Sequence, residues 1–414
     1  MTTPAPAQPA FGGPPARPRP RELGVRIGLL QPGPTNSMVD VAGMSVGHAS
    51  VWRDEPAPPA GRGTARTGVT VIVPFTPAEL FSHRVAAGAA ILNGAGEMIG
   101  ITAIGEWGLI ETPIFLTSSM AIGRVYDAAV EALVERIPRA GIDDALMPVV
   151  AECDDGYLNA SRTVQVDAAD VRAALDGARG AAAGPPASGV VGAGVGMHGF
   201  ELKGGIGNAS RVVPAVVRPR FGRAAAGSGA AADQATAASP SFHVGVLTLT
   251  NFGRIERLTI DGVPIGAVLA AEGWPAMGED EQGSCIVVVA TDAPLLPNQL
   301  SRLARRAGLG LARAGSTGGH GSGEIFVAIS TALRSRRGGG PLVSTTHIHD
   351  EFLDPFFAAV VEATEEAVID SLFVADTVVG RDGHRLAGLP VPRVLELLGA
   401  AGRLADREPQ MSSR

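Results

Sequence analysis

The chain has 414 residues, of which 45% are hydrophobic and 18% charged, and its formal net charge is −7. This balance is typical of a globular protein with a large core, and the lack of a basic stripe interleaved with aromatic residues argues against nucleic-acid binding. The longest apolar runs, such as Cys285 to Ala290, are far too short to cross a bilayer, so we expect no membrane partner.

The two ends of the chain are expected to lie outside the fold. Residues 1–22 are rich in proline, alanine and arginine, which predicts disorder because such sequence buries too little apolar surface. This stretch also lacks the apolar centre of a secretory signal. Cys153 and Cys285 have no metal-type spacing and are interpreted as reduced thiols, which favours a cytoplasmic location. Residues 401–414 are expected to form a flexible tail.

The first half of the chain mixes short strands, one predicted helix and loops. The β-type runs Val41–His48 and Gly68–Val73 end near Gly, Pro or Asp residues, and the alanine-rich stretch Phe81–Ala95 has helical character. Mixtures of Ala, Gly, Ser and Pro at Gly177–Ser188 and Gly222–Pro240 are typical of surface loops.

A glycine-rich region, Gly192–Arg211, lies between these two loops. It does not fit a phosphate-binding loop, because no Gly-Lys-Ser or Gly-Lys-Thr sequence follows it. Turns in a β-rich segment fit this composition, and so does a wall at which backbone approaches a substrate. The region contains Lys203, the only lysine in the chain, so a catalytic lysine could only be this residue.

The second half of the chain has a more regular pattern. Cys285–Ala290 is a continuous apolar run, as expected of a strand buried on both faces, and Pro297–Ala314 is an amphipathic helix. The other expected elements are a strand at Phe242–Leu249, a strand, turn and strand at Glu256–Pro264, a polar loop at 270–283, a strand at Glu324–Ser330 and a helix at Asp354–Ala375. Strands and helices mix without a simple βαβ repeat, which predicts a layered sandwich.

One junction has residues suited to nucleophilic chemistry. The Gly283–Ser284 bond lies where a polar loop enters the predicted buried strand. A serine held there in a strained backbone can attack the preceding carbonyl, and water then splits the resulting ester. The freed α-amine has a reference pKa of about 7.7–8.0, so it can act as the base for its own hydroxyl. Alternatively, Gly283 and Ser284 form a simple turn before the strand, with no role in catalysis.

The segment GSCIVVVATDAPLLPNQLSRLARRAG at 283–308 resembles the nucleophile region of the L-aminopeptidase/D-esterase and β-peptidyl aminopeptidase family. Further segments resemble the same family in the same order, and together they cover roughly residues 24–395. They are VAGMSVGH at 41–48, TGVTVIVP at 67–74, LNGAGEMIG at 92–100, ETPIFLT at 111–117, DDGYLN at 154–159, GFELKGGIGNASR at 199–211, TNFG at 250–253, STGGHGSGEIFVAIST at 316–331 and LDPFFAAVVEATEEAVIDSL at 353–372.

This resemblance implies a fold and a maturation step. The implied fold is α+β, a four-layered αββα sandwich similar to other N-terminal-nucleophile hydrolases, in a single catalytic domain over 23–400. Self-cleavage between Gly283 and Ser284 would give an α chain of 1–283 and a β chain of 284–414. The implied activity is removal of N-terminal residues from short peptides, amides or esters, without a cofactor. The family also implies a tetramer of αβ pairs.

The resemblance also assigns roles to individual residues. Ser284 is the implied nucleophile, and Asn251 is the implied oxyanion donor. Ser322 and Glu324 match the family's supporting pair, which would orient the nucleophile and stabilise the charge on its amine. Their i, i+2 spacing places both side chains on one face of an extended segment.

The substrate amine requires a carboxylate, and several candidates remain open. Glu152, Asp154 and Tyr157 lie in the region that resembles the family's pocket for the amine, and Asp155 is a further candidate. Many relatives carry Leu-Asn-Asp where this chain has Leu158-Asn159-Ala160, so one acid is missing. Asn93 and Glu97 either reach the pocket or begin a helix.

Four other readings compete with this one. Cys285 is a rival nucleophile. A conventional hydrolase would use a histidine such as His320, although no G-x-S-x-G elbow is present. His347, His349 and Asp350 have the residue types of a metal site but no third cluster to complete it. Alternatively, the chain is an uncleaved binding or assembly protein with no activity.

Overall fold

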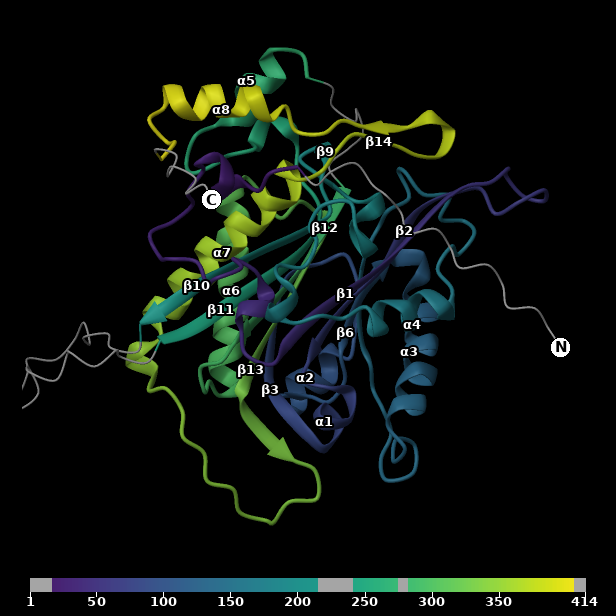
Figure 1. Cartoon of the computed structure of the whole chain (residues 1–414), viewed down its shortest axis with the longest axis vertical. Coiled ribbons are helices and arrows are strands. Elements are labelled where there is room, and N and C mark those ends of the chain that lie inside the picture. The colour runs from purple at the N-terminus through teal and green to yellow at the C-terminus, as the bar shows by residue number, and fades with distance from the viewer. Residues whose placement is uncertain (1–16, 215–240, 275–281, 406–414) are drawn as a thin grey trace, which may run out of the picture.

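A computed structural model of the chain describes residues 17–214, 241–274 and 282–405. Two large β-sheets occupy its centre and run diagonally across the view of Figure 1. The strands are β1 (Met44–Asp54), β2 (Thr64–Pro74), β3 (His83–Gly94), β4 (Met98–Ile99), β5 (Leu109–Ile110), β6 (Ile114–Ser118), β7 (Val149–Cys153), β8 (His198–Gly199), β9 (Leu202–Lys203), β10 (Ile206–Pro214), β11 (Ser241–Asn251), β12 (Gln282–Thr291), β13 (Gly321–Arg336), β14 (Val378–Val379) and β15 (Arg385–Leu386).

Most of the helices flank the two sheets, whereas the two drawn at the top of Figure 1 lie beyond the end of the sheets. The α-helices are α1 (Pro77–Ser82), α2 (Ile101–Trp107), α3 (Ile122–Arg136), α4 (Ala168–Asp176), α5 (Ile265–Ala271), α6 (Pro297–Ala314), α7 (Asp354–Phe373) and α8 (Val391–Ala400). Short 3-10 helices are found at Pro20–Leu23, Met38–Asp40, Ser119–Ala121, Ala181–Ala183, Gly192–Gly196, Ile255–Arg257, Asp350–Phe352 and Arg381–Gly383. Within the described ranges, no helix is both long and apolar enough to span a bilayer.

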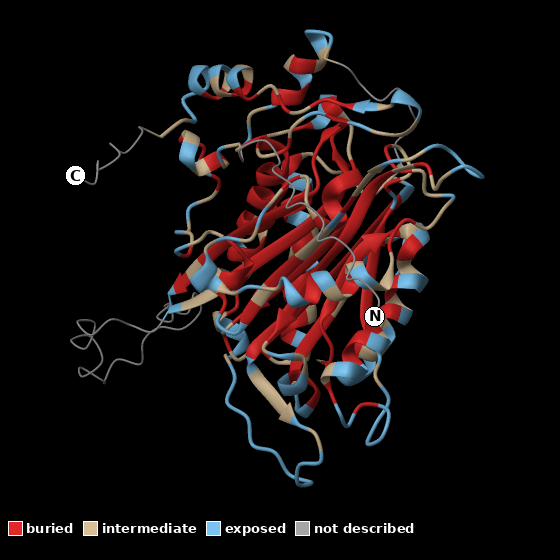
Figure 2. Cartoon of the chain, turned by 45° about the vertical axis from the view of Figure 1, so that its right-hand side comes forward, coloured by how far each residue is buried: buried red, intermediate tan, exposed pale blue. Residues whose placement is uncertain are grey.

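The two sheets are stacked face to face and share an apolar interior. One sheet has the strand order β10-β11-β12-β13-β3-β5, and the other has the order β1-β2-β6-β7-β4. Alternate residues of β12 fill two different cores, because successive side chains of a strand point to opposite faces. Ile286 and Val288 pack between the sheets, whereas Val287 and Val289 pack toward the helices. Figure 2 shows the strands buried along most of their length.

Helices form the two outer layers of the sandwich. α6 and α7 pack on the six-stranded sheet, and the buried side chains of α6 recur at helical spacing, as in Leu300, Leu303, Ala307 and Leu311. α3 and α4 pack on the five-stranded sheet through a third core. The order helix, sheet, sheet, helix is the αββα sandwich expected from the sequence, so the α+β fold class is confirmed.

The helix predicted at Phe81–Ala95 is wrong for most of its length, because residues 83–94 form strand β3 and only Phe81 and Ser82 belong to a helix, α1. The small side chains of β3 serve close packing: a Cβ on Gly88 would lie 2.3 Å from the backbone nitrogen of Ser301 in α6. Alanine favours helices in isolation, but here pairing with β13 and the approach of α6 decide the conformation. The strand, turn and strand expected at Glu256–Pro264 also does not form. A 3-10 helix and an isolated bridge between Ile260 and Val263 replace it.

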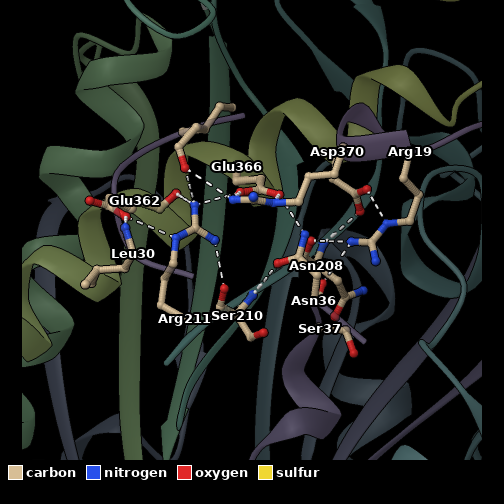
Figure 3. Close-up of polar contacts among 12 residues, drawn as sticks. Arg19, Leu30, Asn36, Ser37, Asn208, Ser210, Arg211, Glu362, Glu366 and Asp370 are labelled. Atoms are coloured by element: carbon tan, nitrogen blue, oxygen red, sulfur yellow. Dashed lines mark hydrogen bonds and ion pairs between the residues drawn. The ribbon is translucent and has the colours of Figure 1, made fainter. Parts of the chain in front are cut away.

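The N-terminal boundary also differs from the expectation of disorder up to residue 22. Residues 17–22 lie against the fold, where Arg19 bonds Asp370 of α7 (Figure 3). Arg21 bonds Glu366 of the same helix. Near the other end, the Ala405 N–H donates to the carbonyl of Gly24 at 2.9 Å. The proposed loop Gly222–Pro240, residues 1–16 and residues 406–414 lie outside the described residues.

Other expected elements agree closely with the structure. The helix Pro297–Ala314 has the expected bounds, and the expected helix Asp354–Ala375 ends two residues earlier than predicted, at Phe373. The run Cys285–Ala290 lies within β12, and Glu324–Ser330 lies within β13. Part of the polar loop expected at 270–283 is structured, because α5 extends to Ala271 and β12 begins at Gln282.

Candidate active site

A polar cavity of about 410 Å³ lies at one end of the six-stranded sheet. Ser284 lines it from the start of β12, next to Asn251 of β11 and Gly323 of β13 in the strand register. The other lining residues are Ala95, Ser119, Glu152, Asp154, Gly156, Tyr157, Ser161, His198, Glu201, Gly253, Arg254, Gly283, Gly321 and Arg381. A cavity of this size suits a small molecule or a short peptide.

The Ser284 side chain lies on the inner face of its sheet, toward the second sheet. Strand alternation places it on the same face as Ile286, which packs between the sheets. Gly96 gives an independent check on this placement. A Cβ at residue 96 would lie 3.9 Å from the Ser284 Oγ and 3.2 Å from the Glu152 Oε1. The hydroxyl and this carboxylate therefore flank one narrow space.

Glu152 is a buried carboxylate held in place on strand β7. Its Oε1 accepts a hydrogen bond from the backbone N–H of Glu97 at 2.8 Å, and its Oε2 accepts one from the Ser119 hydroxyl. The side chain of Glu97 itself is exposed, so this residue contributes its main chain. Two fixed donors orient the carboxylate so that its charge can pair with a cation in the cavity.

The side-chain amide of Asn251 is fixed at both of its ends. Its Oδ1 accepts from the backbone N–H of His198 at 3.3 Å, and its Nδ2 donates to the carbonyl of Asp154 at 2.8 Å. The bond from His198 also settles which end of the amide is nitrogen. An amide nitrogen carries two N–H groups, so Asn251 can donate to Asp154 and to an oxyanion at the same time.

Ser322 and Glu324 form a hydrogen-bonded pair on β13, with the Ser322 hydroxyl as the donor. Both side chains are buried, and Glu324 shares its face of the sheet with Phe326, toward α6. The pair therefore lies on the opposite face from the Ser284 hydroxyl. In the strand register Ser322 is level with Gly283 and Glu324 is level with Cys285, so the pair flanks the Gly283–Ser284 link on that face.

Comparison with known proteins identifies the family. A model of peptidase family S58 matches residues 36–386. The chain is 38% identical over 399 residues to the β-peptidyl aminopeptidase BapA of Sphingosinicella xenopeptidilytica, a match that covers 93% of the chain and 92% of that protein. The chain belongs to peptidase family S58. This S58 chain is therefore a hydrolase that acts on peptide bonds, and the expected aminopeptidase function is confirmed.

Solved structures show the same relationship for this S58 peptidase. The L-aminopeptidase D-Ala-esterase/amidase of Ochrobactrum anthropi superposes with a TM-score of 0.81 at 36% identity, covering 94% of the chain and all of that protein. That structure is described as a variant of the N-terminal-nucleophile hydrolase fold. A β-aminopeptidase of a Burkholderia species gives a TM-score of 0.79 at 38% identity, covering 93% of the chain and 99% of that protein.

The other residues expected at the amine pocket of this S58 peptidase differ in their positions. Tyr157 lines the cavity and stacks on His384, with ring centroids 4.7 Å apart. Asp154 also lines it, whereas Asp155 is buried outside the cavity lining and is bonded to Ser118 and Asn159. Burial raises the pKa of Asp155 to about 6, although these hydrogen bonds oppose the shift.

The rival residues do not converge on the cavity. Cys285 lies on the opposite face of β12 from Ser284, and burial raises the pKa of its thiol well above the ordinary value. His320, His347 and His349 are exposed, and Asp350 is bonded to Gln299 and Arg302. Asn93 donates to the carbonyl of Gly319. Among the residues that the structure describes, no group of three or more His, Cys, Asp or Glu is placed to hold a metal ion.

Sequence reasoning missed several residues that line the cavity. They are Ser119, Ser161, His198, Glu201, Arg254 and Arg381. Burial lowers the pKa of His198 to about 4, with the charge of Lys203 acting in the same direction, so its ring is neutral near pH 7. No hydrogen bond joins this ring to Ser284 within the described part of the chain. The only indication in the sequence was position: Ser119 lies just after the motif ETPIFLT at 111–117, and His198 lies just before the motif GFELKGG that begins at Gly199.

Proposed function

We propose that this S58 aminopeptidase cleaves its own chain between Gly283 and Ser284 and then uses Ser284 as an N-terminal nucleophile. The observation that carries the proposal is the position of the Ser284 hydroxyl. It lines the cavity beside Asn251 and Glu152, whereas the thiol of Cys285 points to the other face. In this account the residues from 23 to 400 form one catalytic domain, with the mature β chain beginning at 284.

The maturation step begins when the Ser284 hydroxyl attacks the carbonyl carbon of Gly283. The acyl group moves from nitrogen to oxygen, and water then hydrolyses the ester to give the Gly283 carboxylate and a free α-amine on Ser284. The Ser322–Glu324 pair is level with this link on the outer face, which suits stabilisation of the new amine in its charged form.

The catalytic cycle uses that amine as the base. It takes the proton of the Ser284 hydroxyl while the oxygen attacks the substrate carbonyl, and Asn251 donates a hydrogen bond to the developing oxyanion. The proton then passes to the leaving amine or alkoxide, and water releases the acyl group from Ser284. Glu152, with Asp154 and Tyr157 nearby, binds the ammonium group of the substrate by charge pairing.

The substrates that we propose are short peptides, amides and esters with a free amino group. The cavity is small, and carboxylates share it with the guanidinium groups of Arg254 and Arg381, a distribution that suits a compact substrate with charges of both signs. Several relatives are named for β-peptides and one for L-amino acids, so both β-alanine amide and L-alanine amide belong in the first assays.

We also propose that the mature protein is a homo-oligomer, a tetramer of αβ pairs, located in the cytoplasm. Ile91, Leu92 and Leu309 support an interface, because each is 58% exposed. Leu92 lies against α6, since a Cβ at Gly308 would be 3.2 Å from its Cδ2. Both cysteines are free thiols, as is usual in a reducing compartment. Size-exclusion chromatography with light scattering would report the assembly.

Mass spectrometry of the purified protein tests cleavage and its position together. We expect two polypeptides, residues 1–283 and 284–414, with the second beginning at serine. Ser284→Ala should remain a single chain without measurable turnover, because it lacks the attacking hydroxyl. Cys285→Ala is the matched control and should mature normally. An active wild-type enzyme that remains one continuous chain would refute the proposal, and so would an active Ser284→Ala variant.

A further inference from the structure

Lys203 is an unexpected residue to find in the interior of this protein. It is the only lysine of the chain, and its side chain is fully buried on the short strand β9. Its Nζ donates to three main-chain carbonyls, those of Gly194 at 3.0 Å, Met197 at 2.5 Å and Gly204 at 2.6 Å. An ammonium group has three N–H bonds, so these carbonyls use all of them.

The three carbonyls belong to segments that lead to Asn251. Gly194 and Met197 belong to the segment that precedes His198, whose backbone N–H donates to the Asn251 Oδ1. On the other side, Gly205 follows Gly204 and exchanges hydrogen bonds with Thr250, the neighbour of Asn251. Lys203 therefore ties together both segments that hold the amide of Asn251.

We propose that Lys203 is a positioning residue, whose ammonium group holds the segments 194–198 and 204–205 so that Asn251 points its N–H at the oxyanion. This inference rests on the proposed function, because it assumes that Asn251 stabilises that oxyanion. Lys203 itself does not line the cavity and touches no substrate. Its effect passes through Met197, His198 and Asn251.

The chemistry of the buried amine supports this role. An isolated charge in the interior is costly, so an ammonium group without a carboxylate partner indicates a use for its three donors. A neutral amine has only two N–H bonds, and its lone pair would then face a carbonyl oxygen. Loss of the proton therefore breaks one of the three bonds and loosens the contact to Asn251.

This arrangement has a consequence for the pH dependence of turnover. Burial lowers the pKa of Lys203 to about 7. Among the described residues, the titratable group that faces it is His198 on the paired strand β8, whose pKa is lowered to about 4 and which stays neutral in this range. The contact to Asn251 is thus complete only well below pH 7 and weakens as pH rises through about 7. The Ser284 amine acts in the opposite sense, because it must lose its proton to serve as a base.

A double-mutant cycle tests whether Lys203 acts through Asn251. Asn251→Ala should lower kcat about 10²- to 10³-fold, and Lys203→Met about 10- to 100-fold with little change in KM. The double variant should match Asn251→Ala alone, because no amide remains to be positioned. Rates are referred to the amount of the 284–414 fragment, so that slow maturation is not mistaken for slow turnover.

Thr248→Val, on the same strand as Asn251, is the matched control. It removes a buried hydroxyl for which the described structure has no hydrogen-bond partner, so kcat should stay within about 2-fold of wild type. The inference is wrong if the fold losses in kcat from Lys203→Met and Asn251→Ala multiply in the double variant. It is also wrong if a folded Lys203→Met variant has the kcat of wild type. An inactive wild-type enzyme would instead refute the proposed function.

A second measurement needs no variant at Lys203, in case that substitution prevents folding. The kcat of wild-type enzyme should follow a bell-shaped pH profile, because deprotonation of the Ser284 amine raises kcat and loss of the Lys203 proton, whose pKa is about 7, gives the profile a falling limb. This falling limb should be absent in Asn251→Ala, whereas the rising limb from the Ser284 amine should remain. A falling limb that persists unchanged in Asn251→Ala would show that it does not arise from the positioning of Asn251.

Discussion

At the scale of single residues, the charge of Glu152 should determine whether a substrate needs an amino group. In Glu152→Gln the amide oxygen can still accept from the Glu97 N–H, and the amide nitrogen can donate to the Ser119 hydroxyl, but the negative charge is gone. A charge-assisted hydrogen bond contributes about 1.5–3 kcal/mol, so kcat/KM for an amino-acid amide should fall about 10- to 100-fold. Steady-state kinetics on purified, cleaved enzyme would measure this.

The choice of substrate provides the control for Glu152. An ester of the same size without the amino group has no charge to pair, so its kcat/KM should change little in the variant. Glu106→Gln, at an exposed site on α2, should leave both substrates unaffected. An equal loss for the amino and the des-amino substrate would mean that Glu152 does not bind the amine.

The sequence indicated candidate residues of the site mainly through family resemblance. The roles of Ser284 and Asn251 stay predictions, and their position opposite each other in antiparallel strands is something that no spacing in the chain predicts. Ser322 and Glu324 lie on the opposite face of the sheet from the Ser284 hydroxyl. The sequence could not predict this, because it depends on which core each face of β13 covers. Ser119 was missed because its role comes only from its contact with Glu152.

At the scale of elements, the turn between β3 and β4 forms one wall of the reacting space. A Cβ at Gly96 would lie 3.2 Å from the Glu152 Oε1 and 3.9 Å from the Ser284 Oγ. The methyl groups of Gly96→Val would therefore occupy the space for the substrate between nucleophile and carboxylate. We expect turnover to fall about 10²-fold or more, because even about 1 Å of misplacement has such an effect. Stability should change by less than about 1 kcal/mol, since residue 96 is exposed.

Thermal unfolding and kinetics measured on the same samples separate these two effects. Gly105→Ala is the matched control, because a Cβ there meets nothing within 4 Å in the helix α2. That variant should keep its activity and gain a little stability from the better helix propensity of alanine. If Gly96→Val has normal turnover, the substrate does not bind in the space between the Ser284 hydroxyl and the Glu152 carboxylate.

Elements with a strong internal pattern were predictable, and those shaped by distant contacts were not. The amphipathic period of α6 and the apolar run of β12 specify their own structure. Strand β3 was predicted as a helix because its alanines, such as Ala86 and Ala87, favour helices locally. What decides its structure is the pairing with β13, more than 200 residues away.

At the scale of the whole molecule, a buried ionic network ties the N-terminal segment to the helix layer. Glu362, Glu366 and Asp370 lie at spacings of four along α7, where Arg19 pairs with Asp370 and Arg211 pairs with Glu362 and Glu366 (Figure 3). Arg21 also pairs with Glu366. Disorder was predicted for the segment 17–22 because its composition buries little apolar surface, but its arginines find carboxylate partners on α7. No local pattern around Pro20 encodes those contacts.

Glu366 is the centre of this network, and its removal should destabilise the protein. Burial alone would raise its pKa, but Arg211 and Arg21 outweigh burial, so the pKa lies below the ordinary value of 4.5. Its stabilising contribution is therefore present above about pH 4.5 and is lost as pH falls through the lowered pKa. Glu366→Gln leaves the fully buried Arg211 with one carboxylate, that of Glu362.

We expect Glu366→Gln to lower the free energy of unfolding by about 3–5 kcal/mol near pH 7, the usual effect of breaking a buried ion pair. Urea unfolding at several pH values should show this difference shrinking toward pH 3, where the wild-type carboxylate also loses its charge. Burial raises the pKa of Asp370, an effect of opposite sign that largely cancels between wild type and variant. Glu131→Gln, in the exposed pair with Arg172, is the control and should change stability by less than about 1 kcal/mol. A difference that stays constant from pH 7 to pH 3 would show that the charge of Glu366 is not what stabilises the N-terminal segment on α7.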